Sequence, residues 1–294
     1  MIKLRHLVLI ALASVFMYAC GDDINNRFVD NFDHAAQAVV DQDTLVKYFK
    51  NHYYDAALDT IKPIESGKTS LFDDSNLKVQ DITENEIDYK LYHYIIREGN
   101  PNPSKDFPTV MDSVLVTYTG LTIENSLNQS RTFEVQNSAT WFTLDAVIGG
   151  WRHGFTNFKG GENITNNGPI TYQNGGKGIL FIPSGLAYRN QGSGAIPANT
   201  PLLFYINLLD HVEGTDHDND GLASILEIED ASEQPDPRRV NTDSDQLPNY
   251  RDNDDDGDGT LTKDEDANGD GDPRNDFSDS SNPTLPDYLN PRIK

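Results

Sequence analysis

The sequence has a single cysteine, Cys20, which excludes a fold held together by intrachain disulfides. It also has few basic residues: 23 lysines and arginines stand against 47 aspartates and glutamates, giving a formal net charge of -24. A surface this negative repels phosphate backbones, which excludes nucleic acid as a primary partner and favours multivalent cations. Residues 214–294 hold 23 of the acidic residues and only 7 of the basic ones, so the excess is concentrated there.

A hydrophobic run long enough to cross a bilayer is absent as well. The apolar stretch from Leu7 to Phe16 follows a short basic start and is too short for a transmembrane helix. We therefore predict that residues 1–19 are a signal peptide. Met17-Tyr18-Ala19-Cys20 resembles a bacterial lipobox, so lipid on Cys20 is the expected membrane anchor. The alternative is an ordinary signal peptide with a chance cysteine.

The residues after Cys20 bear on where the protein resides. Residues 20–30 are expected to be a lipidated linker, and Asp22-Asp23 resembles the acidic surface-export signals of Bacteroidetes lipoproteins, with a plain solvated linker as the alternative. We expect an outer-membrane lipoprotein that faces the periplasm or the cell surface.

Residues 31–105 are expected to form an N-terminal extension without a chemical motif. Asp43 and Thr44 are expected to cap a helix that carries the apolar residues from Leu45 onward. The run from Ile87 to Ile95 predicts a β-strand. The three histidines of this region lack the spacing of metal ligands and are interpreted as structural or surface residues: His34, His52 and His93.

A proline-rich break at 101–108 precedes a region of β signals that we take as a domain over 106–213. Residues 113–120 alternate as a strand that ends at glycine, and residues 202–209 form a final apolar strand. Between them, residues 147–158 predict a turn and a short helix with aromatic residues on one face. Several strands with one short helix define an α+β fold class.

Four ordered motifs and a closing strand give this region a family resemblance. They are Val116-Thr117-Tyr118-Thr119-Gly120, Val147-Ile148-Gly149-Gly150-Trp151, Ile182-Pro183-Ser184-Gly185-Leu186-Ala187-Tyr188, Ile196-Pro197 and the strand from Leu202 to Leu209. Over residues 112–212 the chain resembles the FKBP-type, macrolide-binding peptidyl-prolyl isomerases. The resemblance implies an antiparallel sheet curled around a short helix, with an apolar pocket between them.

The implied reaction is cis/trans isomerisation of the peptide bond before proline in exported proteins. Its barrier is about 18–20 kcal/mol because the amide loses resonance as it twists. No nucleophile and no cofactor is needed, since a dry aromatic pocket that prefers the twisted amide lowers the barrier. The resemblance implies that Trp151 forms the floor of the pocket. It implies that the Ile148 N–H and the Tyr188 hydroxyl donate hydrogen bonds to substrate carbonyls. Tyr188 is also a wall of the pocket, and the other wall residues are Tyr118, Phe133, Val147, Ile196 and Phe204.

Three departures from the family pattern favour a non-catalytic binding or chaperone module as the alternative function. The usual Phe-Asp pair corresponds to Phe133-Glu134 or to Leu127-Asn128, of which the first has the better spacing. The usual Tyr-Gly is Tyr188-Arg189, and an insertion rich in Asn and Gly occupies 163–176.

The acidic segment 214–294 contains two calcium-loop patterns. Residues 216–227 read DHDNDGLASILE and residues 254–265 read DDDGDGTLTKDE, with acids at positions 1, 3, 5 and 12 and glycine at position 6. Alternate carboxylates converge on one cation, the glycine permits the sharp turn, and the last glutamate closes the shell. The expected structural calcium ligands are Asp216, Asp218, Asp220, Glu227, Asp254, Asp256, Asp258 and Glu265, with weaker units at Asp243, Asp245 and Asp252 and at Asp266, Asn268 and Asp270.

An internal repeat organises this segment, since Leu247–Asp252 recurs as Leu285–Asn290. The arrangement resembles thrombospondin type 3-like calcium repeats, and the prolines at 248 and 286 disfavour paired helix-loop-helix hands. Because repeats of this kind contact mainly their neighbours, the loop at 216–227 is expected to respond less than the loop at 254–265 to the loss of Asp254 and Asp256. The alternatives are a solvated acidic linker, or a calcium-dependent structural protein of the cell surface that does not use the pocket.

Overall fold

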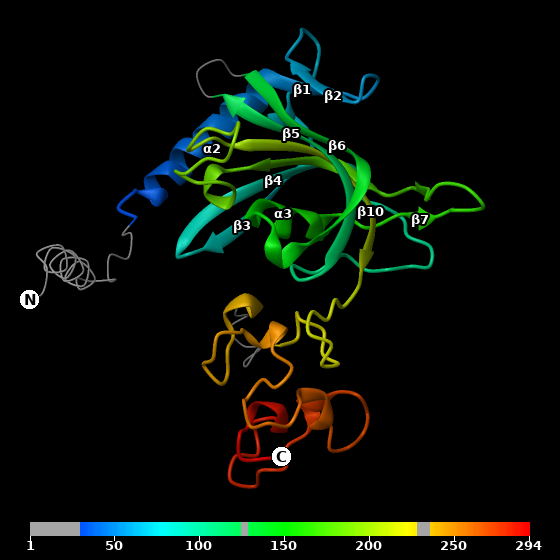
Figure 1. Cartoon of the computed structure of the whole chain (residues 1–294). Helices are drawn as coiled ribbons and strands as arrows, with labels where there is room; N and C mark the ends of the chain where they lie inside the picture. Colours follow the sequence, from blue (N-terminus) through cyan, green and yellow to red (C-terminus); the bar gives the residue numbers. More distant parts are fainter. Residues whose placement is uncertain (1–29, 125–128, 228–235) are drawn as a thin grey trace, which may run out of the picture. The chain divides into compact units, whose positions relative to one another are not determined.

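The computed structural model describes residues 30–124, 129–227 and 236–294 (Figure 1). Cys20 and the predicted signal peptide lie outside the described residues. The chain divides after Asp33 into two units, and every feature below belongs to the second, His34–Lys294. In the part of the chain that is described, no helix is both long and apolar enough to cross a membrane.

A six-stranded sheet in the order β3-β4-β9-β10-β5-β6 forms the centre of the fold, and all neighbouring strands are antiparallel. One short helix, α3 (Gly149–Gly154), packs against it, which confirms the predicted α+β class. The strands are β3 (Leu77–Glu84), β4 (Ile87–Arg97), β5 (Ser113–Glu124), β6 (Gln129–Thr143), β9 (Gly176–Ile182) and β10 (Leu202–Val212).

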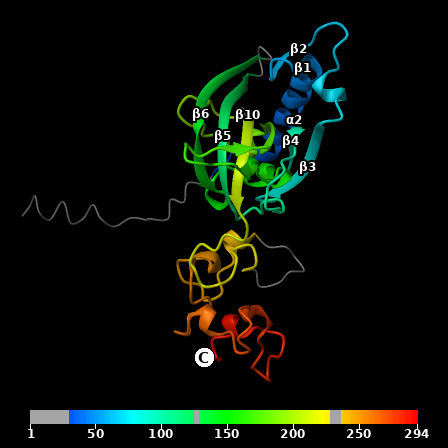
Figure 2. The ribbon, with the colours of Figure 1, turned by 90° about the vertical axis from the view of Figure 1, so that its right-hand side faces the viewer.

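The central strands are buried on both faces, because their alternate side chains pack in two different cores. Each core includes a helix, and the two helices lie on different sides of the sheet (Figures 1 and 2). Leu180 and Ile182 of β9 pack in the core that contains α3. Ile179 and Phe181 pack in a second core with the helix α2 (His34–Asn51). The pocket predicted from the sequence therefore lies on only one of the two faces, the one that carries α3.

Two glycines allow α3 to approach the sheet closely. A Cβ at Gly150 would lie 2.2 Å from Ile182 Cγ2, and one at Gly154 would lie 2.7 Å from Leu180 Cδ1. Any larger residue would push α3 away from β9. Gly150 of the family motif and Gly154 thus fix the distance between helix and sheet.

Two expectations about element ends were wrong. Thr44 does not cap a helix, because α2 begins ten residues earlier, at His34, and the Thr44 hydroxyl donates to the Val40 carbonyl inside it at 2.8 Å. Gly120 does not end its strand, since β5 continues to Glu124. A Cβ at Gly120 would lie 2.5 Å from the Phe133 ring and 2.8 Å from the Phe204 ring, so this glycine makes room for aromatic side chains.

Residues 31–105 contribute α2, β3 and β4 to the same two cores, and β4 confirms the strand predicted over 87–95. His52 and His93 are buried, with His52 Nδ1 2.8 Å from the Tyr48 carbonyl oxygen. Two small hairpins complete the domain: β1 (His52–Asp55) with β2 (Thr60–Pro63), and β7 (Glu162–Asn163) with β8 (Tyr172–Gln173) in the predicted insertion.

The acidic segment has little regular structure. Among its described residues there are short 3-10 turns and no α-helix, in agreement with the expectation against helix-loop-helix hands. The turns are η5 (Pro237–Arg239), η6 (Asn249–Arg251), η7 (Thr262–Asp264), η8 (Pro273–Asn275) and η9 (Asp287–Leu289). A small apolar cluster joins Leu222 near the start of the segment to Tyr288 and Leu289 near its end.

Candidate active site and acidic segment

An aromatic cluster lies between α3 and the concave face of the sheet. Trp151 from α3 is 4% exposed, and its ring packs edge-on against Tyr118 of β5 at 4.7 Å and Phe204 of β10 at 5.2 Å between centroids. Phe133 of β6 packs against Phe204 at 5.7 Å. All eight residues predicted for the pocket belong to this one core, the others being Val147, Ile148, Tyr188 and Ile196.

The surroundings of the Tyr118 hydroxyl bear on an alternative left by the sequence. Glu134 follows Phe133 on β6, lies opposite Gly120 and hydrogen-bonds the Tyr118 hydroxyl. Burial, followed by this carboxylate, raises the pKa of Tyr118 to about 12. The geometry therefore supports Phe133-Glu134 as the equivalent of the family's Phe-Asp pair, whereas Leu127-Asn128 lies outside the described residues.

Val147 and Ile148 enter the cluster at the start of α3. The Ile148 carbonyl accepts from the Trp151 and Arg152 N–H groups at 2.9 and 3.1 Å. The N–H of Ile148 precedes the first helical turn and makes no hydrogen bond with any described residue. It is therefore a donor at the edge of the aromatic cluster.

The loop after β9 carries Tyr188 and is held from two sides. Asp41 of α2 is 1% exposed, and its Oδ2 accepts from both the N–H and the hydroxyl of Ser184 at 2.6 Å. Arg189 occupies the family's glycine position with φ +51°, the left-handed region that favours glycine. Its N–H donates to the Ser184 carbonyl at 2.9 Å, so the loop is closed on itself beside the cluster.

With this geometry established, the comparisons with known proteins decide the class of the domain. Residues 104–209 match the sequence model of a family described as FKBP-type peptidyl-prolyl cis-trans isomerase. This segment is an FKBP-type domain. The same comparison covers the motifs at Tyr118, Trp151 and Tyr188 on which the resemblance rested.

Relatives of the FKBP-type domain occur in several bacteria. The chain is 34% identical over 125 residues to FKBP-type peptidyl-prolyl cis-trans isomerase FkpA of Escherichia coli, covering 41% of this chain and 37% of that protein. It is 36% identical over 97 residues to a probable FKBP-type 25 kDa isomerase of Pseudomonas aeruginosa, covering 33% of this chain and 34% of that protein. A crystal structure of E. coli FkpA overlaps 73% of this chain and 85% of its own, at 22% identity and a TM-score of 0.36. The chain thus spans little more than a third of the length of the curated relatives it matches.

Beyond the FKBP-type domain, three loops of the acidic segment repeat one backbone geometry. The first aspartate of each accepts from the N–H of the glycine five residues later: Gly221 to Asp216 at 3.2 Å, Gly259 to Asp254 at 3.0 Å, and Gly271 to Asp266 at 2.7 Å. Positions 4 and 6 of every loop have positive φ. The third loop, whose ligands were expected at Asp266, Asn268 and Asp270, therefore has the turn, but exposed Phe277 stands where the others have a glutamate.

The first two loops bring their carboxylates together. Oxygens of Asp216, Asp218 and Asp220 lie within 4.8 Å of one another, as do those of Asp254, Asp256 and Asp258. Oxygens of Asp243, Asp245 and Asp252 form a further, more exposed group. Both closing acids, Glu227 and Glu265, are buried, and neither carboxylate has a hydrogen-bond partner among the described residues.

Unpaired buried carboxylates fit a bound divalent cation. Burial and the nearby Asp218, Asp220 and Asp255 raise the pKa of Glu227 to about 9. Burial and the three aspartates of its own loop raise that of Glu265 to about 8. These shifts arise because like charges are forced together in a poorly solvated place. A hard cation with oxygen ligands relieves this repulsion, and the donor set is the one calcium prefers.

A second repeat in the acidic segment was not predicted from the sequence. Asp236-Pro237-Arg238 and Asp272-Pro273-Arg274 form equivalent turns in which the aspartate accepts from the arginine N–H at 3.2 Å and pairs with its guanidinium. The two Asp-Pro-Arg triplets are a signal that comparison of the segment with itself would have found.

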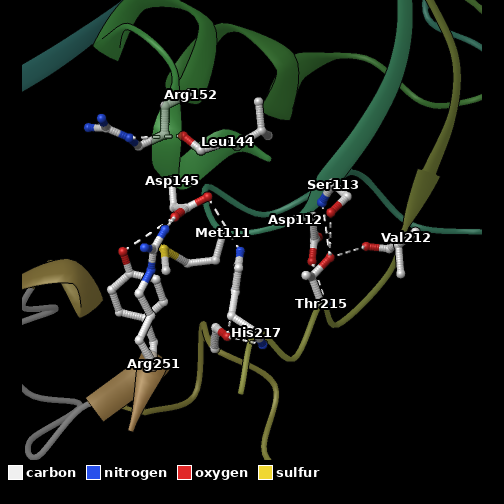
Figure 3. A network of polar contacts seen from close by, with 12 residues as sticks. Met111, Asp112, Ser113, Leu144, Asp145, Arg152, Val212, Thr215, His217 and Arg251 are labelled. Carbon is white, nitrogen blue, oxygen red and sulfur yellow. Dashed lines mark hydrogen bonds and ion pairs between the residues drawn. The ribbon is translucent and has the colours of Figure 1, made fainter. Parts of the chain in front are cut away.

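The acidic segment also contacts the FKBP-type domain at Asp145, two residues before Val147 (Figure 3). Arg251 Nη2 lies 2.7 Å and the Tyr250 hydroxyl 3.3 Å from Asp145 Oδ2, while His217 Nε2 lies 3.3 Å from Oδ1. Burial raises the pKa of Asp145, but hydrogen bonds from Thr143 and Arg251 and the charge of His217 outweigh it and leave the pKa below its usual value. The turn that leads into the aromatic cluster is therefore fastened to the acidic segment.

Proposed function

We propose that the protein is a peptidyl-prolyl cis-trans isomerase acting on proline-containing segments of exported proteins. The observation that carries the proposal is the aromatic cluster of Tyr118, Trp151 and Phe204, assembled from three separate elements of an FKBP-type domain. Val147 and Tyr188 pack at its edge and are only partly buried, so they are accessible to a peptide.

The cluster suits a reaction that needs no cofactor and no proton transfer. The proline ring enters an apolar, aromatic site, and the amide before it leaves water. A twisted amide carries less conjugation than a planar one, so it loses less by this desolvation and is bound more tightly. Donors at the rim then hold the carbonyls of the substrate: the Ile148 N–H and the Tyr188 hydroxyl.

The test is the rate of cis/trans exchange in short Xaa-Pro peptides with the full chain. We expect faster exchange for peptides with leucine or phenylalanine before proline than for peptides with glutamate there, because the site is apolar and the protein is strongly acidic. Exchange at the spontaneous rate for every peptide, with time constants of tens to hundreds of seconds, refutes the proposal.

A non-catalytic chaperone or binding module is the second candidate, and Arg189 is the observation that favours it. A large charged side chain replaces the family's glycine directly after Tyr188, in strained left-handed backbone. Binding of a proline peptide without any acceleration of exchange would favour this function over the first.

The acidic segment is proposed to bind structural calcium. Its two complete loops hold buried carboxylates without partners, and the segment has only a small apolar cluster to order it. Limited trypsin digestion at Arg238, Arg239, Arg251 and Lys263 tests this: cleavage should be fast in chelator and slow in millimolar calcium. Equal cleavage rates in chelator and in calcium would indicate that the segment is only an acidic linker.

A lipid on Cys20 is proposed to anchor the protein to the outer membrane, facing the periplasm or the cell surface. The support is the apolar run that ends at Ala19-Cys20. Cys20→Ser should release the protein into the soluble fraction. Retention of that variant on membranes after a high-salt wash would place the anchor elsewhere.

A further inference from the structure

Asp255 is a buried acid at a position that the calcium-loop pattern leaves open. It is the second residue of the loop 254–265, and it is 1% exposed. Its Oδ2 accepts from the Thr262 hydroxyl at 3.1 Å, whereas its Oδ1 has no partner among the described residues. The side chain is thus held in one orientation with an unpaired oxygen.

The first loop has the same internal contact at the same positions. His217 is its second residue, and His217 Nδ1 lies 2.9 Å from the hydroxyl of Ser224, the ninth residue. Thr262 is the ninth residue of the second loop, so the two pairs are equivalent. In the first loop this contact directs His217 out of its loop to Asp145. The equivalent contact directs Asp255 out of the second loop.

Asp255 meets the first loop. One oxygen each from Asp220, Glu227 and Asp255 lies within 4.8 Å of the other two, and all three side chains are at most 1% exposed. Asp220 Oδ2, both oxygens of Glu227 and Asp255 Oδ1 have no hydrogen-bond partner among the described residues. Three buried carboxylates in this arrangement repel one another strongly unless a cation lies between them.

We propose that the cation bound by the loop 216–227 takes a further ligand from Asp255, so that this site is built from two loops. The proposal rests on the calcium binding proposed above for the acidic segment. Two oxygens bound to one calcium at roughly 2.3–2.6 Å are at most about 5 Å apart, which the three carboxylates satisfy. Calcium accepts six to eight oxygens, so a loop that offers four carboxylates leaves room for a fifth.

This ligand makes the order of one loop depend on the other. Asp255 lies 28 residues after Glu227, and the chain between them contains Tyr250 and Arg251, which contact Asp145. A cation held from both sides keeps Asp255 beside the first loop, and with it the nearby Tyr250 and Arg251. The first loop therefore gains affinity from the second, in contrast to the expectation that the loop at 216–227 responds little to changes in the loop at 254–265.

The test is a calcium titration of the full chain followed by hydrogen exchange in peptides covering 216–227 and 254–265. Asp255→Asn removes the proposed ligand. Asp254→Asn removes an expected ligand of the second loop that does not belong to the group of Asp220, Glu227 and Asp255. Asp264→Asn removes the same charge from an exposed neighbouring position. We expect Asp255→Asn to raise the calcium concentration for half-protection of 216–227 by about tenfold or more, since ligand charge sets affinity. Asp254→Asn should act mainly on 254–265, and Asp264→Asn on neither.

The outcomes separate the two proposals. If the parent protein gains no protection from calcium in either peptide, calcium binding by the segment fails, and the shared site fails with it. If the parent is protected but Asp255→Asn leaves the midpoint of 216–227 at the parental value, only the shared site is overturned.

Discussion

Replacing Asp145 by asparagine should loosen the contact between the acidic segment and the FKBP-type domain. The Asp145 side chain is 1% exposed and faces Arg251, Tyr250 and His217. Asparagine keeps one acceptor oxygen but loses the charge, and its NH₂ group faces a donor. A hydrogen bond to a charged group contributes about 1.5–3 kcal/mol. Because Arg251 is 48% exposed and regains water, we expect a loss near the lower end, about 2 kcal/mol.

The measurement is the free energy of unfolding of the full chain from urea denaturation, with Asp81→Asn as the control. Asp81 forms an ion pair with Lys90 whose side chains are 77% and 48% exposed, so its loss should leave stability unchanged within error. The pH dependence gives a second check. Since the folded pKa of Asp145 is depressed, its contribution is present above the unfolded value of about 3.9 and is lost as the pH falls through the folded value. The reasoning is refuted if the two variants are equally stable at pH 7, or if the loss in Asp145→Asn persists under strongly acidic conditions.

Three further substitutions test the packing around the aromatic cluster, each by urea denaturation. Gly150→Ala places a Cβ 2.2 Å from Ile182 Cγ2 and should cost about 1–3 kcal/mol, and parental stability of this variant would contradict the packing. Combined with Ile182→Ala, it should lose less stability than the sum of the two single losses, because the contact is then absent. Arg189→Gly should stabilise the protein by about 0.5–1 kcal/mol because it relieves left-handed backbone, whereas an equal gain from Arg189→Ala would show that the side chain, not the backbone, is the cause. Asp41→Ala leaves the buried N–H and hydroxyl of Ser184 without their acceptor and should cost about 2–3 kcal/mol, so a neutral result would show that water replaces the carboxylate.

The site could be predicted from the sequence because its motifs are local. Each motif places one or two pocket residues on a strand or at a helix start, and the alternation of strands fixes the face they occupy. The resemblance to the FKBP-type family placed Tyr118, Trp151 and Phe204 in one pocket, and the structure brings them together. The loops at 216–227 and 254–265 were predictable in the same way, since twelve consecutive residues define each.

What the sequence could not show depends on contacts between distant residues. Thr44 has the side chain of a helix cap, but its surroundings are set by where α2 packs on the sheet. Gly120 resembles the end of a strand, yet its function is to leave space for rings from two other strands. Asp145 is one of 47 acidic residues, and nothing in the sequence distinguishes it from the others. Its role follows only from its contacts with Arg251 and His217 in the folded structure.

The most direct test of the proposed activity compares exchange rates in a Leu-Pro peptide for the full chain, Tyr188→Phe and Tyr172→Phe. Each variant removes one hydroxyl, but the Tyr172 hydroxyl contacts Asp210 at 3.2 Å, outside the aromatic cluster. If Tyr188 donates to the substrate carbonyl, kcat/KM should fall about three- to tenfold in Tyr188→Phe, the equivalent of a net hydrogen bond, and should stay at the parental value in Tyr172→Phe. Equal rates for the two variants would contradict the role of Tyr188, and a parental rate no faster than spontaneous exchange would contradict the isomerase function itself.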